Sequence, residues 1–317
     1  MIHRLTGSLV VALMAVGLVA STSCGGAYSS VAISGSSEVD HGPALDDAPG
    51  RIVSISTVAT EMLFAIGAGD RVVAVDAQSN YPADAPITDL SGFEPNVEAI
   101  LGFQPDLVVL SYDPGDVVAS LEAAGVATLL QGAAHAIADV YSQIEALGAA
   151  TGNKEAATAL VVDMQTEIAD LADSVEFRDE PLSYYHELDD TLYTVTSSTF
   201  IGELYAQAGL VNAADPADAD GSAWGYPQVS AEYILDADPD LIFLADTRCC
   251  AQNAVTVADR PGWGNLTAVN GGRIVELDDD VASRWGPRIV DFFRAIVDAI
   301  NSLAFKNKKI VSPKFIN

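Results

Sequence analysis

Short apolar runs alternate with amphipathic segments over the first part of the chain. Residues 60–66 and 117–124 carry apolar positions at helical spacing and end at Gly67 and Gly125, and a shorter helix is expected at 96–101. Runs rich in Val, Ile and Leu, with the length of buried strands, occur at 51–56, 72–76, 107–111 and 126–131. This alternation predicts a parallel sheet with helices on both faces.

A similar alternation returns after residue 181. We predict strands at 183–188, 241–245 and 273–277, and helices at 199–208, 231–235 and 284–303, the last with a break at Pro287. The predicted fold class is therefore α/β, with two Rossmann-like lobes whose sheets are rich in parallel strands. Such sheets bind ligands beyond the carboxyl ends of their strands.

One segment of the chain is used twice. Residues 98–110 align without gaps with residues 232–244, 134 positions later, and seven of the thirteen residues are identical. Each copy predicts a short helix, a Pro-Asp turn and a buried strand, and residues 121–130 are loosely echoed by 266–277. The separation exceeds the period of about 20–50 residues that is typical of solenoids. The repeat therefore indicates two similar lobes, with a ligand cleft between them.

A longer helix is predicted between the two copies. Apolar residues recur at helical spacing from Ala157 to Val175, and Asn153 can cap the segment. A helix of this length spans about 35 Å, roughly the width of a domain. We interpret it as a rod that joins the lobes, and the alternative is one more helix that covers a sheet.

The N-terminus has the features of an export signal. His3 and Arg4 precede an uncharged apolar run at 9–20 that ends in small residues. The residues around Cys24 resemble a bacterial lipoprotein processing site, which predicts lipidation of Cys24 and anchoring to the outer face of the cell membrane. The alternative is secretion with cleavage near Ala20. The predicted division of the chain is signal peptide 1–24, tether 25–50, N-terminal lobe 51–152, connecting helix 153–176, C-terminal lobe 177–303 and basic tail 304–317.

Composition excludes one class of partner. The formal net charge is −29 and the pI about 4.1, so the chain lacks the basic face that nucleic acids require. A hydrophobic content of 50% is enough for real cores. We expect a monomer, and we assign no role to the basic tail.

Cys249 and Cys250 are adjacent in the chain. Neighbouring Cα atoms lie about 3.8 Å apart, which is closer than a relaxed disulfide prefers. A vicinal disulfide would be strained and would stiffen its loop. The alternative is a pair of reduced, partly buried thiols.

Enzyme signatures are scarce. The chain has no His-Glu-x-x-His, P-loop or Gly-x-Ser-x-Gly motif, and the two histidines beyond the tether, His135 and His186, are too few for a typical zinc site. We therefore expect no resident metal and no cofactor. The alternatives are a secreted α/β hydrolase-like enzyme, which would draw on Ser197, Ser198, His186 and Asp189 without a nucleophile elbow, and a cleft-bearing surface sensor.

Glu98 and Glu232 occupy matching positions in the repeat. Asn96 and Ser230 can cap the two helices, which places both carboxylates in first turns. Acids there stabilise a helix by about 0.3–1 kcal/mol through its dipole. Two equivalent carboxylates could also contact a two-fold partner and pair with its arginines.

Several motifs together resemble a known family. They are residues 51–67, Asn80-Tyr81-Pro82, residues 226–232 and residues 280–288. Over roughly residues 50–302 the chain is similar to the helical-backbone, or class III, periplasmic solute-binding proteins of ABC importers. That family includes vitamin B12-binding and ferric-siderophore-binding proteins.

The resemblance implies a non-enzymatic protein with two lobes, one long connecting helix and modest hinge motion. It implies that Glu98 and Glu232 dock onto arginines of the permease dimer. The ligand expected from the resemblance is a metal chelate, with a ferric siderophore preferred over cobalamin or haem. The residues expected to bind it are Tyr81, Tyr112, Tyr226, Asp280, Arg284 and Trp285.

Two details bear on the ligand. Tyr112 and Tyr226 stand where cobalamin-binding members tend to have Trp, and Phe93 only roughly matches another aromatic position. These departures from the family pattern weaken the case for cobalamin in particular. Arg284 is expected to pair with an anionic chelate, and the alternative is a helical residue paired with Asp280.

Overall fold

The first sheet has five parallel strands. The computed structural model describes residues 48–176 and 179–307, which belong to one compact unit. The strand order is β3-β2-β1-β4-β5, and the strands are β1 (Ile52–Ile55), β2 (Val72–Asp76), β3 (Ile87–Leu90), β4 (Leu107–Leu110) and β5 (Ala127–Leu130). Strands β1 and β4 are buried throughout, which explains why their sequences are continuously apolar. Helices α1 (Thr57–Ala65), α2 (Val97–Leu101) and α3 (Val117–Ala123) connect the strands.

The second sheet has four parallel strands and is separate from the first. Its order is β7-β6-β8-β9, with β6 (Ser183–Glu187), β7 (Val211–Asn212), β8 (Leu241–Leu244) and β9 (Ile274–Glu276). Its helices are α6 (Phe200–Gln207), α7 (Ala231–Ala237), α8 (Ala254–Ala258) and α9 (Thr267–Asn270). The structure therefore confirms an α/β fold with two parallel sheets.

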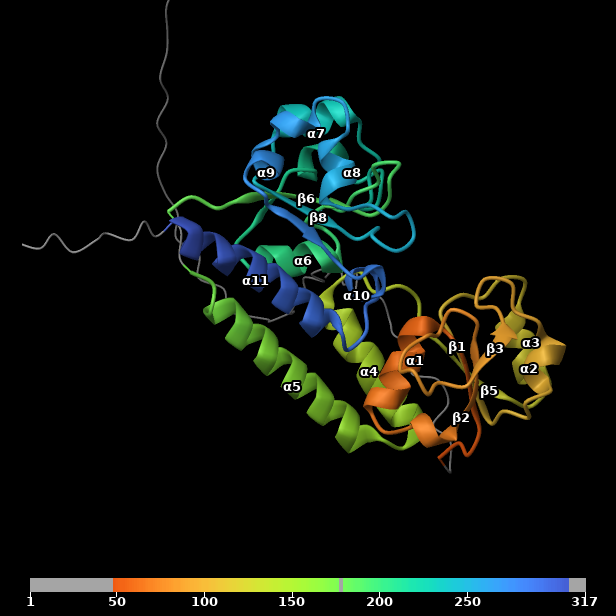
Figure 1. Ribbon diagram of the computed structural model, residues 1–317. Helices are drawn as coiled ribbons and strands as arrows, with labels where there is room; N and C mark the ends of the chain where they lie inside the picture. Colours follow the sequence, from red (N-terminus) through yellow and green to blue (C-terminus); the bar gives the residue numbers. More distant parts are fainter. Residues whose placement is uncertain (1–47, 177–178, 308–317) are drawn as a thin grey trace, which may run out of the picture. The chain divides into compact units, whose positions relative to one another are not determined.

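Four further helices complete the described chain. They are α4 (Ile137–Thr151), α5 (Lys154–Asp173), α10 (Asp279–Ser283) and α11 (Ile289–Asn307). Helix α5 packs against α4 and α11 (Figure 1). Helices α4 and α5 approach closely where Gly148 meets Ala157, since a Cβ at Gly148 would lie 2.3 Å from the Ala157 Cβ. Helix α5 lies within the predicted helix, while the division of the chain into lobes at these bounds stays a prediction.

The sequence interpretation and the structure differ in several places. Asn153 stands at the N-cap position of α5 as predicted, but its side chain makes no capping hydrogen bond, because it accepts a hydrogen bond from Arg71 and donates one to the Ile66 carbonyl at 2.9 Å. The predicted helix 284–303 is α11 and begins only at Ile289, after Pro287; Arg284 is the C-cap of α10. The helix α4 was missed although Ile137, Val140, Ile144 and Leu147 give it a buried face at helical spacing. Elements β3, β7, α8, α9 and α10 were also missed, and each has at most five residues.

Both copies of the repeat have the same local structure. Asn96 and Ser230 accept hydrogen bonds from the backbone N–H groups of Ala99 and Tyr233, at 3.0 and 3.2 Å, as the capping prediction requires. Gln104 and Asp238, which align in the repeat, both have positive φ, 51° and 39°. Four neighbouring strands of each sheet also match, since the order β2-β1-β4-β5 corresponds to β7-β6-β8-β9.

The aspartate of each Pro-Asp turn joins two strands. Asp106, before β4, accepts from the backbone N–H groups of Gly50 and Arg51 at 2.9 Å, next to the start of β1. Asp240, before β8, accepts from the N–H of Ser183, the first residue of β6, at 3.0 Å. The conserved spacing within the repeat thus encodes a contact between the two central strands of each sheet.

We expect Asp106→Ala and Asp240→Ala each to lower the free energy of unfolding by about 1–2 kcal/mol, because each removes charge-assisted hydrogen bonds to the backbone. Urea denaturation followed by circular dichroism measures this. The matched control is Asp163→Ala, which removes an exposed acid of α5. Losses no larger than that of the control would contradict the role assigned to these aspartates.

Candidate ligand-binding site

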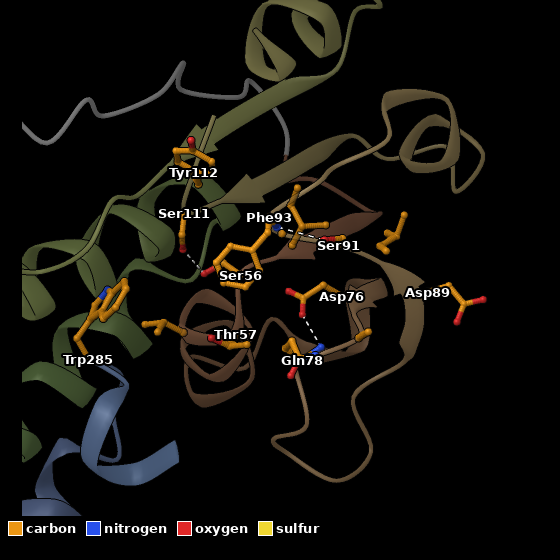
Figure 2. Close-up of a pocket in the computed structure, with 15 residues that line it drawn as sticks. Ser56, Thr57, Asp76, Gln78, Asp89, Ser91, Phe93, Ser111, Tyr112 and Trp285 are labelled. Atoms are coloured by element: carbon orange, nitrogen blue, oxygen red, sulfur yellow. Dashed lines mark hydrogen bonds between the residues drawn. The ribbon is translucent and has the colours of Figure 1, made fainter. Parts of the chain in front are cut away.

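A cavity of about 290 Å³ opens at the carboxyl ends of the strands in the first sheet. Ser56 follows β1, Asp76 ends β2 and Ser111 follows β4, and all three line the cavity (Figure 2). Trp285, from the segment between α10 and α11, completes the wall. The volume is at the lower end of the range of about 300–1,000 Å³ that is typical of small-molecule pockets.

Hydroxyl groups and a carboxylate form the polar floor of the cavity. The hydroxyls of Ser56 and Ser111 are hydrogen-bonded at 2.5 Å, and Ser56 also caps α1 by accepting from the Ala59 N–H at 3.1 Å. Asp76 is buried and accepts from the Gln78 N–H at 2.7 Å. Burial raises the pKa of Asp76, and its hydrogen bonds and the charge of Arg284 oppose this effect only in part.

Aromatic side chains form the apolar part of the wall. Phe93 is 79% exposed and Tyr112 is 58% exposed, which is unusual for large apolar rings. Trp285 is half-buried, and its Nε1–H donates to Gln143 Oε1 at 3.1 Å. Exposed rings next to a cavity offer flat apolar surfaces on which a ligand can stack.

A buried carboxylate forms ion pairs with two arginines, one of which contacts the wall of the cavity through Gln78. Glu61, on α1, is 3% exposed. Its Oε1 accepts from Arg284 Nη1 at 3.0 Å and from Arg288 Nη2 at 2.5 Å, and its Oε2 accepts from Arg288 Nε at 2.8 Å. Gly286 packs against the same carboxylate. These bonds join α1 to the segment between α10 and α11.

Arg284 has further partners within the protein. It donates to Asp280 Oδ1 and Asn80 Oδ1, both at 2.8 Å, and to the carbonyl of Gln78 at 3.2 Å. Asp280 also accepts from Arg248 Nη1 at 2.9 Å. The guanidinium of Arg284 is therefore paired with carboxylates of this chain, as in the alternative stated from the sequence.

The structure brings together some of the predicted ligand-binding residues. Tyr112 and Trp285 line the cavity, and Arg284 and Asp280 lie at its edge through their contacts with Gln78 and Asn80. Tyr81 lies in a separate hollow of about 430 Å³, where the Arg288 guanidinium stacks 4.3 Å from its ring centre. Tyr226 is exposed on a loop beside the second sheet and is not among the residues that line the cavity. A ligand-binding role for these residues stays a prediction.

Several residues that line the cavity were not singled out from the sequence. They include Ser56, Asp76 and Ser111, each of which ends a predicted strand, and Asp89, which lies in the missed strand β3. Their position at strand ends was the signal that could have identified the first three. Trp224 was also missed; it is 83% exposed and has a positive φ of 56°. Asp218 holds its loop by accepting from the N–H groups of Ala223 and Gly225, at 2.8 and 2.7 Å.

The corresponding edge of the second sheet carries a buried ion pair. Glu187, at the end of β6, is fully buried and accepts from both terminal nitrogens of Arg260, at 2.7 and 2.5 Å. Asp246, after β8, is also fully buried, and its carboxylate has no hydrogen-bond partner among the described residues. Burial and the neighbouring Glu187 raise the pKa of Asp246 to about 8.

The residues of the hydrolase alternative do not assemble into a catalytic group. Ser197 is hydrogen-bonded to Asp215, and Ser198 to Thr196. His186 is buried against the Tyr205 hydroxyl, and burial lowers the pKa of His186 to about 3. Asp189 accepts from Thr191. The side chains of His186 and Asp189 thus have other partners than Ser197 and Ser198.

Other predictions concern single surface features. Cys249 is exposed and Cys250 half-buried, and both are free thiols in the structure, not a disulfide. Glu98 and Glu232 are exposed in the first turns of α2 and α7.

Several predictions fall on parts of the chain that the structure does not describe. These parts are Cys24 with the signal peptide, nearly all of the tether and most of the basic tail. Within the described ranges, no group of three or more His, Cys, Asp or Glu side chains is arranged to hold a metal ion, and no helix is long and apolar enough to cross a bilayer.

Comparisons with known proteins agree with this architecture. The family model described as "Periplasmic binding protein" matches residues 52–281. The "Uncharacterized ABC transporter substrate-binding lipoprotein YvrC" of Bacillus subtilis is 30% identical over 81% of this chain and 82% of its own length. The "Cobalamin-binding protein" of Halobacterium salinarum is 32% identical over 81% of this chain and 71% of its own length. The crystal structure of the "periplasmic Vitamin B12 binding protein BtuF" of Vibrio cholerae superposes with a TM-score of 0.64, at 26% identity, over 83% of this chain and 99% of that one.

The geometry of Glu61 leads to a prediction of stability. We expect Glu61→Ala to lower the free energy of unfolding by about 3–5 kcal/mol, because it leaves Arg284 and Arg288 without their buried counter-charge. Denaturant titration measures this. The matched control is Glu167→Ala, which breaks the exposed pair with Arg294 and should cost about 1 kcal/mol or less. An equal loss of unfolding free energy in the two variants would show that the buried Glu61 contacts stabilise the protein no more than the exposed Glu167–Arg294 pair does.

Proposed function

The chain belongs to the periplasmic binding protein family, and on that premise we propose that it captures a metal chelate outside the cytoplasm and delivers it to an ABC importer. Members of this family are binding components of transport systems, so the chain is not an enzyme and the hydrolase alternative is set aside. The observation that carries the proposal is the cavity with its rim of Phe93, Tyr112 and Trp285 at the ligand-binding edge of a parallel sheet.

The relatives support this choice of ligand. Two proteins similar to this chain are named as cobalamin-binding or vitamin B12-binding, and the B. subtilis relative is named as an ABC transporter substrate-binding lipoprotein. We propose cobalamin, haem or a ferric siderophore as the ligand, because the corrin and porphyrin rings present flat surfaces, and chelate ligands present carbon atoms, that the three aromatic side chains can contact. Anchoring through a lipid on Cys24 is part of the same proposal.

Delivery requires a surface that the permease recognises. Glu98 and Glu232 are exposed, occupy equivalent positions in the repeat, and take no part in an ion pair among the described residues. We propose that they pair with arginines of the permease dimer.

The ligand proposal is tested by binding. We expect the purified protein to bind at least one of cyanocobalamin, haem and a ferric siderophore in isothermal titration calorimetry. Phe93→Ala and Tyr112→Ala should each weaken that binding about tenfold, because each removes a stacking surface. The control Val162→Ala, which truncates an exposed apolar side chain on α5, should leave the affinity unchanged. A panel without any binder would refute the proposal.

The delivery proposal is tested separately. In cells that depend on this protein for uptake, we expect Glu98→Ala with Glu232→Ala to reduce uptake at least tenfold while the affinity of the protein for its ligand stays the same. Glu155→Ala is the matched control, because Glu155 is also an exposed acid in the first turn of a helix, α5. Normal uptake by the double variant would exclude docking through these carboxylates. A surface sensor, in contrast, would not support uptake even in its unmodified form.

A further inference from the structure

We infer that the cavity selects metal chelates that carry no net negative charge and present N–H or O–H donors at their edge. This inference rests on the proposed function and narrows its ligand class. It also reverses the expectation from the sequence that Arg284 pairs with an anionic chelate.

The first argument is the charge of the cavity wall. The described residues that line the cavity include two carboxylates, Asp76 and Asp89, and no Lys, Arg or His. Asp76 is 3% exposed, so solvent screens its charge poorly, while Asp89 is exposed at the rim. An anionic group placed in this cavity would meet like charge and no counter-ion.

The second argument is that the nearest arginines are already neutralised. Arg284 and Arg288 share Glu61, and Arg284 and Arg248 share Asp280. Asp278 lies 3.4 Å from Arg248, and Asp279 accepts from the Arg248 and Cys249 N–H groups. Three arginines therefore face four carboxylates in this cluster, which leaves it with an excess negative charge.

The third argument is hydrogen-bonding capacity. The carboxylate of Asp89 is exposed at the rim of the cavity, and it can only accept hydrogen bonds when ionised. Both oxygens of the buried Asp76 already accept, from the Gln78 N–H and from the Ser79 hydroxyl, so the acceptors open to a ligand are the Asp89 carboxylate and the side-chain carbonyl of Gln78. The wall also carries hydroxyl groups that can donate, so its preference for carboxamide or hydroxyl groups over carboxylates or phenolates comes from the negative charge of the two aspartates.

Chelate chemistry then separates the three proposed ligands. A corrinoid with peripheral carboxamides and a neutral ferric hydroxamate have donors or a neutral edge. Haem has two propionates, and a ferric tris-catecholate has three negative charges. We expect the cavity to prefer the first two.

The test uses pairs of chelates that share one metal but differ in charge, and in two of the pairs the members also share one macrocycle. The affinities of cyanocobalamin and of its derivatives with peripheral amides hydrolysed to carboxylates are compared by calorimetry, and so are those of iron protoporphyrin dimethyl ester and haem. A neutral ferric hydroxamate and a ferric tris-catecholate form a third pair. For each pair that binds, we expect the member without negative charge to bind at least about tenfold tighter. Increasing the salt concentration should reduce this difference in affinity.

Variants show whether the wall causes the preference. Asp76→Asn with Asp89→Asn should reduce the charge preference severalfold, because both negative charges are removed with little change of shape. Asp163→Asn, on the exposed face of α5, should leave it unchanged. Circular dichroism confirms that each variant is folded, and Asp89→Asn alone, at an exposed position, supplies the test if the double variant does not fold.

The outcomes distinguish this inference from the proposed function. Binding of the anionic member as tightly as, or more tightly than, its neutral partner would overturn the charge selectivity and leave the binding function intact. A preference that survives the loss of both aspartates would overturn the role of the wall. Failure of every chelate to bind would overturn both proposals.

Discussion

The contact of Glu61 with Arg284 and Arg288 is the constraint on which the site depends. A carboxylate at 3% exposure is unfavourable unless it is paired, and both of its oxygens are occupied by guanidinium groups. The pair ties α1 of the first sheet to the segment between α10 and α11, which also supplies Trp285 to the cavity. The same bonds remove the arginine charges from the ligand's reach, so one interaction shapes the cavity and sets its charge.

The two sheets share a plan and differ at their ligand-binding edges. In each, a Pro-Asp turn joins the two central strands, through Asp106 in the first sheet and Asp240 in the second. At the carboxyl edge the first sheet leaves a cavity, whereas the second fills the equivalent position with Glu187 and Arg260. The two copies of the repeat share the contacts that hold the strands together, whereas the side chains that follow the strands differ between the sheets.

The site thus combines a flat apolar rim with an acidic floor. Phe93 and Tyr112 offer ring surfaces, and Asp76 and Asp89 supply negative charge. The protein's net charge of −29 has the same sign as this floor. Charge and shape therefore favour the same kind of ligand, a broad chelate whose edge donates hydrogen bonds.

The sequence by itself determined the strand–helix alternation, the repeat and the caps at Asn96 and Ser230, because these depend on residues a few positions apart. It also led to Tyr112 and Trp285, which line the cavity, through their positions after a strand and within a recognisable motif. Only the tertiary structure decided what Arg284 does, since its buried partner Glu61 lies 223 residues away and no local pattern links them. The charge of a site depends on which side chains are in contact in the folded protein. Short-range periodicity in the sequence does not predict contacts between residues that are far apart in the chain.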